Sequence, residues 1–123
     1  MCFDIGLTVR QALADFQRNG DPYAGSAGRY SADNGSIMRL APVVLFYFPD
    51  TNRIRTFSAA SSLTTHAVEE AVECCLVLSK VIANALPGEA KTQELKVDSA
   101  DLIEPKVTAI AQGTYRERYV LTL

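Results

Sequence analysis

The sequence predicts an all-α protein. Along most of the chain, apolar residues recur at intervals of three and four, which is the spacing of one face of a helix. Proline and glycine punctuate these runs, and we find no internal repeat and no strand-turn-strand pattern. The chain has 123 residues, 48% of them hydrophobic, and a chain of this size buries about two thirds of its unfolded surface. We therefore expect one compact domain of several helices over residues 1–123.

The first helix is predicted near the N-terminus. Its apolar stripe consists of Ile5, Val9, Ala12, Leu13 and Phe16. The sequence Asn19-Gly20-Asp21-Pro22 supplies stop signals directly after this stripe. Residues 20–35 carry four of the seven glycines and have no helical period, so they are predicted to form a long loop. Long loops in compact domains are often functional.

The second helix is predicted from a stripe that contains a proline. The stripe consists of Ile37, Leu40, Ala41, Val44, Leu45 and Phe48. Pro42 lies inside it, and because proline lacks an N–H group it either kinks a helix or marks a new start. We expect one kinked helix, ended by Pro49.

A weaker third helix is predicted after Pro49. Asp50 or Thr51 can cap its first turn, since both side chains accept hydrogen bonds from backbone N–H groups. Ile54 and Phe57 lie on its apolar face. We expect the helix to break near residues 62–65.

The fourth helix has the clearest pattern and is expected to be central, from about Thr65 to Leu86. Its stripe consists of Val68, Ala71, Val72, Cys75, Leu76, Ser79, Ile82, Ala83 and Leu86. Its outward face is predicted to hold Glu69, Glu70, Glu73 and Lys80. Thr65 is the expected cap, and Pro87-Gly88 closes the helix.

The C-terminal part of the sequence has shorter patterns. Residues 89–96 suggest a short helix, residues 97–104 a loop, and the apolar spacing that follows a second short helix around Val107. The tail at residues 116–123 fits a helix or a strand equally and is left unassigned.

Charge and cysteine content exclude several classes of function. The 12 basic and 14 acidic side chains nearly balance, so we expect no binding to nucleic acid or to a membrane surface. Apolar runs are too short to cross a bilayer, and residues 1–4 lack the basic start of a signal peptide, which favours a cytoplasmic protein. The three cysteines do not suggest a disulfide framework, and Cys75 is predicted to lie in the core.

A polar loop that leads into a helix, residues 31–42, is the best candidate for a binding site. Asn34, Gly35 and Ser36 can expose backbone N–H groups where a helix begins, and such a position attracts anions such as phosphate. The alternative, favoured on this stretch alone, is that Asp33 or Ser36 only caps the helix.

Three motifs in order carry a resemblance to a known family. They are Asp4-Ile5-Gly6-Leu7-Thr8-Val9-Arg10, the loop Ser31-Ala32-Asp33-Asn34-Gly35-Ser36-Ile37-Met38-Arg39-Leu40-Ala41-Pro42, and Leu63-Thr64-Thr65-His66. Over about residues 3–115 the chain resembles the central part of the ADP-ribosylglycohydrolase family, including the dinitrogenase-reductase-activating glycohydrolases. The resemblance implies an all-α fold and cleavage of ADP-ribose from an acceptor with two magnesium or manganese ions. The aspartate motifs that hold these ions in the family are not found in this sequence, so we expect no metal ligands and no cofactor in this chain.

The resemblance also assigns residues to a substrate pocket. It places Asn34, Gly35 and Ser36 around the pyrophosphate, Arg39 one turn further on, and His66 against the substrate. Asp4 matches an acidic residue near the metal-bound ribose and is a weak catalytic candidate. The alternatives are a capping or half-buried role for His66 and an ordinary N-cap role for Asp4.

Two positions depart from the family pattern. Asp33 stands where the family usually has glycine, which puts a negative charge beside the expected phosphate. Leu7 stands where a polar residue is usual, so one substrate contact is expected to be absent.

Two functions remain open. The first is a truncated ADP-ribosylglycohydrolase-like protein that binds ADP-ribose or another phosphate-bearing small molecule but does not hydrolyse it alone. The second is a small helical interaction or assembly module without ligand chemistry. In either case the part of the family fold that is absent here would leave apolar surface exposed, and such surface is usually covered by a partner. We therefore expect a homo-oligomer or a partner chain.

Overall fold

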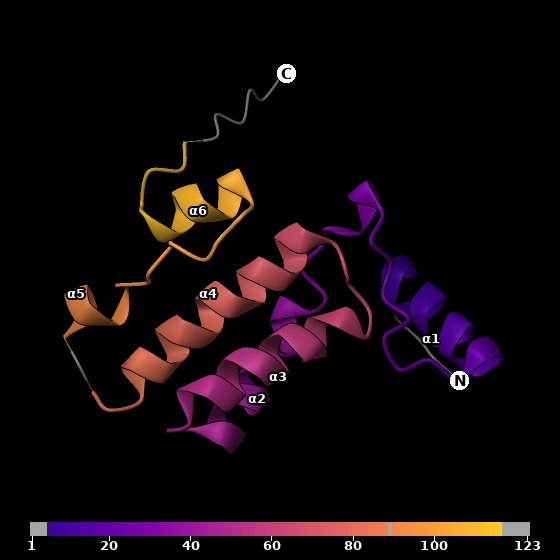
Figure 1. The fold of residues 1–123 in the computed structure, drawn as a ribbon, viewed down its shortest axis with the longest axis horizontal. Coiled ribbons are helices and arrows are strands. Elements are labelled where there is room, and N and C mark those ends of the chain that lie inside the picture. Colours follow the sequence, from indigo (N-terminus) through magenta and orange to yellow (C-terminus); the bar gives the residue numbers. More distant parts are fainter. Residues whose placement is uncertain (1–4, 89, 117–123) are drawn as a thin grey trace.

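A computed structural model describes residues 5–88 and 90–116 and confirms the all-α class (Figure 1). Its α-helices are α1 (Leu7–Asn19), α2 (Ala41–Tyr47), α3 (Thr51–Leu63), α4 (Glu69–Ala85), α5 (Lys91–Glu94) and α6 (Pro105–Ala111). Two short 3-10 turns, η1 (Arg29–Ser31) and η2 (Ile37–Arg39), lie in the long loop and at its end. Within these residues the only β-type pairing is an isolated bridge between Ser26 and His66.

Helix α4 is the centre of the fold. It packs against α2, α3 and η2 on one side and against α5 and α6 on the other, while α1 lies at the far end of the molecule (Figure 1). The buried core is formed by Leu40, Val44, Ile54, Cys75 and Ala83. Cys75 is therefore a core residue, as predicted. No helix of the described residues is long and apolar enough to cross a membrane.

The prediction of one kinked helix over 37–48 is wrong. A 3-10 turn ends at Arg39, and α2 starts afresh at Ala41 with Pro42 in its first turn. Continuing one α-helix would require the missing N–H of Pro42 to reach the carbonyl of Met38, where the proline ring would also clash. In the first turn of a new helix, the backbone N–H has no acceptor within the helix, so a proline there loses no hydrogen bond.

The predicted helix caps had different outcomes. Asp50 does cap α3, since its Oδ1 accepts a hydrogen bond from the N–H of Arg53 at 3.0 Å. The prediction that Thr65 caps α4 is wrong, because α4 begins four residues later at Glu69 and its N-cap, Val68, has no side-chain bond. Thr65 is instead buried, with its hydroxyl directed to other polar groups.

The prediction that Glu73 faces outward is also wrong. Its side chain is 2% exposed, whereas Glu69 and Lys80 do face solvent. Helix α4 is covered on two sides, so a residue outside the main stripe can still be buried. Leu76, which the stripe placed in the core, is only half-buried.

The C-terminal elements follow the expected order. Helix α5 lies within 89–96 and α6 contains Val107, which is buried, and the segment 97–104 between them has no helix. Of the unassigned tail, residues 117–123 lie outside the described part of the chain.

Candidate functional site

The long loop is joined to the end of α3 through backbone hydrogen bonds. The N–H of Gly25 donates to the carbonyl of Leu63 at 3.0 Å, and the N–H of Ala67 donates to the carbonyl of Ser26 at 3.0 Å. Gly25 has to be glycine, since a Cβ there would lie 2.9 Å from the backbone nitrogen of His66. This close approach places the 20–35 loop directly over the residues that follow α3.

His66 lies in the middle of this junction. Its side chain is fully buried, its Nε2 is 2.5 Å from Oδ1 of Asp33, and its Nδ1 is 2.7 Å from the hydroxyl of Thr65. An ionised carboxylate only accepts hydrogen bonds, so Nε2 carries a proton and donates to Asp33. Both ring nitrogens of His66 are therefore bonded within the chain.

The carboxylate of Asp33 receives hydrogen bonds from three different segments. The hydroxyl of Thr8 on α1 donates to Oδ2 at 2.7 Å, and the N–H of Gly35 donates to Oδ1 at 3.0 Å, in addition to the bond from His66. The Thr8 hydrogen bond lowers the pKa of Asp33 most, and Gly35 and His66 lower it further against the opposite effect of desolvation. Asp33 is therefore ionised at neutral pH and ties α1 to the loop.

Arg39 stabilises the same junction through hydrogen bonds from its guanidinium. Its guanidinium donates to the carbonyl of Ser61 at 2.8 Å and to the hydroxyls of Thr64 and Thr65 at 3.1 and 2.6 Å. It also reaches the carbonyl of Gly35 at 3.4 Å. These bonds satisfy groups at the C-terminus of α3, so Arg39 supports the loop rather than pointing into open space.

The three residues expected around a pyrophosphate have different surroundings. Asn34 is exposed, Gly35 is half-buried against the ring of His66, and Ser36, backbone included, is 1% exposed. The hydroxyl of Ser36 is 3.0 Å from that of Ser62 and accepts a weak bond from the thiol of Cys75 at 3.6 Å. The hydroxyl of Ser36 is thus buried and already bonded within the chain.

A hollow of about 250 Å³ lies beside this loop, and we call it the loop hollow. It is lined by Ala32, Asp33, Asn34, Ser36, Ile37, Glu70, Ala71 and Cys74. Burial first, and then the nearby carboxylate of Glu70, raise the pKa of Cys74 to about 11. The thiol is therefore protonated near neutral pH and is not a nucleophile there.

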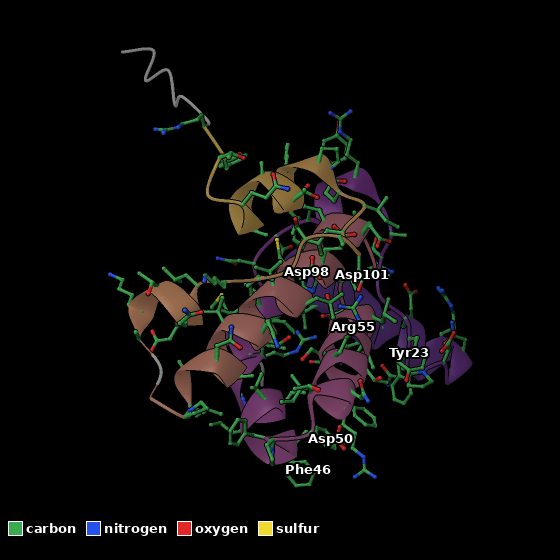
Figure 2. All side chains as sticks on the ribbon, turned by 60° about the vertical axis from the view of Figure 1, so that its left-hand side comes forward. Tyr23, Phe46, Asp50, Arg55, Asp98 and Asp101 are labelled. Atoms are coloured by element: carbon green, nitrogen blue, oxygen red, sulfur yellow. The ribbon has the colours of Figure 1, made fainter. Side chains whose placement is uncertain are left out.

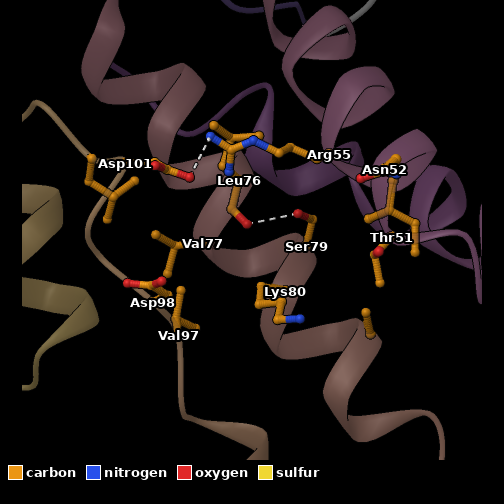
Figure 3. Close-up of a pocket in the computed structure, with 13 residues that line it drawn as sticks. Thr51, Asn52, Arg55, Leu76, Val77, Ser79, Lys80, Val97, Asp98 and Asp101 are labelled. Atoms are coloured by element: carbon orange, nitrogen blue, oxygen red, sulfur yellow. Dashed lines mark hydrogen bonds and ion pairs between the residues drawn. The ribbon is translucent and has the colours of Figure 1, made fainter.

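A second hollow of about 220 Å³ lies between α3, α4 and the 97–104 segment (Figure 3). At its edge, Arg55 from α3 and Asp101 from the segment form an ion pair, with 3.7 Å between the guanidinium nitrogen and the carboxylate oxygen. The hydroxyl of Ser79 donates a hydrogen bond to the carbonyl of Leu76. None of the residues predicted for a site lines it.

The structure brings together most of the predicted site residues. The carbonyl of Gly35 accepts a hydrogen bond from Arg39, Gly35 also lies against the ring of His66, and Asn34 and Ser36 line the loop hollow. Asp4 lies outside the described residues. In the part of the chain that the structure describes, no three His, Cys, Asp or Glu side chains come close enough to hold a metal ion. These residues therefore do not fit the two-metal centre that the family resemblance implies.

Glu73 is an important polar residue that the sequence analysis missed. Its two carboxylate oxygens accept hydrogen bonds from the N–H groups of Ile103 and Glu104 at 2.6 and 2.9 Å. These two groups precede α6, so Glu73 fixes the start of that helix against α4. No local pattern in the sequence joins position 73 to a segment thirty residues away.

The described residues form an all-helical fold in which a polar loop closes over a buried histidine, and this is consistent with the family that the sequence motifs indicate. Residues 1–120 match the ADP-ribosylglycohydrolase family, and the chain belongs to this family.

Two curated relatives match the chain over 117 residues, which is 95% of its length. An ADP-ribosylarginine hydrolase Tri1 of Pseudomonas putida (strain GB-1) is 34% identical, and one of Serratia proteamaculans (strain 568) is 28% identical. The chain covers 31% and 32% of these proteins, so it spans about a third of their length. No solved structure matches it.

Proposed function

We propose that this chain binds an ADP-ribosyl group at the loop hollow, with Asn34, Gly35 and Ser36 at the pyrophosphate, near Arg39 and His66. One observation carries the proposal: Asn34 and Ser36 both line the loop hollow, and the backbone N–H of neither residue makes a hydrogen bond within the described residues. Unpaired N–H groups beside such a hollow are suited to phosphate oxygens. The family and the names of the relatives support ADP-ribose as the source of that phosphate.

We further propose that the isolated chain does not hydrolyse its ligand. In the family that the chain resembles, the reaction depends on a cage of carboxylates, and the described residues do not assemble one. Asp4, the weak catalytic candidate, could supply at most one ligand. A cytoplasmic location is the natural setting for this function and stays a prediction.

Titration calorimetry with ADP-ribose, with and without Mn²⁺, tests the binding proposal. We expect weak binding, with a Kd on the order of 1 mM, and no release of ADP-ribose from an ADP-ribosylated arginine peptide. Gly35→Val should abolish binding because its Cβ would lie 2.8 Å from the ring of His66. Gly28→Val is the matched control, since it alters a loop glycine whose nearest neighbour is the movable hydroxyl of Ser26. Equal affinities for all three proteins, or robust Mn²⁺-dependent release, would contradict the proposal.

An interaction module is the second candidate, and the surface of α2 favours it. Phe46 and Leu45 are 79% and 59% exposed, and Phe46 projects from the end of the helical core (Figure 2). Next to them Tyr47 and Phe57 stack with ring centroids 4.5 Å apart, and both line a mainly apolar groove. Apolar surface of this kind is usually covered by another protein surface.

The homo-oligomer expected from the sequence can be measured directly. Sedimentation equilibrium at high protein concentration should show a dimer or larger species, and Phe46→Asp should shift it toward monomer because it places a charge on the exposed α2 surface. Tyr30→Asp, at a 97% exposed position on η1, should leave the distribution unchanged. A wild-type protein that is monomeric at every concentration would refute self-association.

A further inference from the structure

The three donors around Asp33 form an anion site that is already filled. The Thr8 hydroxyl, the Gly35 N–H and the His66 Nε2 come from three separate segments and converge on one carboxylate at 2.5 to 3.0 Å. One of these donors belongs to a fully buried side chain, and its direction is fixed by the bond from Thr65 to the other ring nitrogen. Such a set of oriented donors recognises a negative oxygen-bearing group.

The bond between Asp33 and the N–H of Gly35 interrupts the row of N–H groups proposed to bind pyrophosphate. The N–H groups of Asn34 and Ser36 make no bond within the described part of the chain, whereas that of Gly35, between them, is taken by Asp33. A phosphate at this row would meet the Asp33 carboxylate, and Glu70 lines the same hollow from α4. The guanidinium of Arg39 is directed to carbonyl and hydroxyl groups instead.

We infer that Asp33 lowers the affinity of this loop for anions: its carboxylate takes the place of a ligand phosphate in a site made by Thr8, Gly35 and His66. The inference rests on the proposed function for the identity of the ligand but not for the existence of the site. Removing the side chain frees three donors and removes a like charge, while the loop remains anchored through Gly25, Ser26 and Arg39.

Binding of two probes, inorganic pyrophosphate and ADP-ribose, to four proteins tests the inference. Asp33→Gly should bind pyrophosphate at least about tenfold more tightly than wild type, because hydrogen bonds to charged groups are gained and repulsion is lost. Asp33→Asn removes the charge but keeps a turn-forming side chain, so its affinity for pyrophosphate should lie between those of wild type and Asp33→Gly. Asp101→Asn is the matched control, because it removes one exposed carboxylate at the edge of the other hollow and should bind like wild type.

The amide of Gly35 reports on the carboxylate without any ligand. In wild type its NMR chemical shift should titrate with a midpoint below the ordinary pKa of an aspartate, and this inflection should vanish in Asp33→Asn. Thermal melts of each variant show that the fold is kept. A Gly35 amide without an acidic inflection would overturn the inference.

The binding outcomes separate this inference from the proposed function. Tighter pyrophosphate binding by Asp33→Gly without any ADP-ribose binding would support the filled anion site and refute the ADP-ribose proposal. Equal ADP-ribose affinity in wild type and both Asp33 variants would support the proposed function and overturn the inference. A folded Asp33→Gly that binds neither probe would overturn the inference as well.

Discussion

Gly25→Ala is expected to lower the free energy of unfolding by about 3 to 4 kcal/mol, the cost of forcing a methyl group into backbone that cannot move aside. The new Cβ would clash with the carbonyl oxygen of Leu63 and lie 2.9 Å from the nitrogen of His66. Leu63 is the last residue of α3, and His66 lies in the turn that follows it toward α4. The variant must therefore separate the loop from that turn, which breaks the hydrogen bonds of Gly25 and Ala67.

Chemical denaturation of Gly25→Ala and of a control, Gly6→Ala, measures this effect. A methyl group at Gly6 would have no neighbour within 4 Å, and Gly6 precedes α1 with φ −61°, so its substitution should cost less than about 1 kcal/mol. The junction also positions His66, and Gly25→Ala should therefore weaken any ligand binding at the loop hollow. Similar stability losses for the two variants would show that the loop does not depend on the close approach at Gly25.

The fold was predictable where the helical period and its punctuation agree. The ends of α1 and α4 follow from Gly20 and Pro87-Gly88, and the cap of α3 follows from Asp50, because these signals act within one turn of the chain. Pro42 was the ambiguous signal, since a proline fits both a kink and a first turn and only the 3-10 geometry at η2 decides.

The candidate site was predictable as a set of residues but not as a network. The motifs drew attention to the loop and to His66, but the bond between Asp33 and His66 joins positions 33 residues apart. A local reading made Thr65 a cap because threonine precedes the helix. The structure instead uses its hydroxyl between Arg39 and His66, a pairing that only the folded chain creates.

The burial of Glu73 also depends on a contact between segments that are far apart in the sequence. The helical pattern of α4 has one main stripe, and a glutamate beside it is normally solvated. Because α6 packs on a second side of α4, the same position lies inside the protein, and its charge is satisfied by backbone N–H groups of the approaching chain (Figure 1). The sequence of α4 alone holds no information on that second contact.

This contact gives the second large effect: Glu73→Ala is expected to reduce the free energy of unfolding by about 3 kcal/mol, because it leaves two backbone donors before α6 without an acceptor. Glu73→Gln keeps one acceptor oxygen but adds a donor, so its loss should be smaller. Glu69→Ala, one turn earlier and exposed, is the control and should cost less than about 1 kcal/mol.

Hydrogen exchange distinguishes a local effect of Glu73 from general destabilisation. If the carboxylate fixes the start of α6, the amides of Ile103 and Glu104 should exchange much faster in Glu73→Ala, while core amides near Val44 keep most of their relative protection. The hollow between α3, α4 and the 97–104 segment should widen as the segment loosens, whereas the loop hollow, which that segment does not line, should keep its shape. Unchanged exchange at residues 103 and 104 in a folded Glu73→Ala protein would show that α6 is held by its apolar contacts alone, with Val107 as the main anchor.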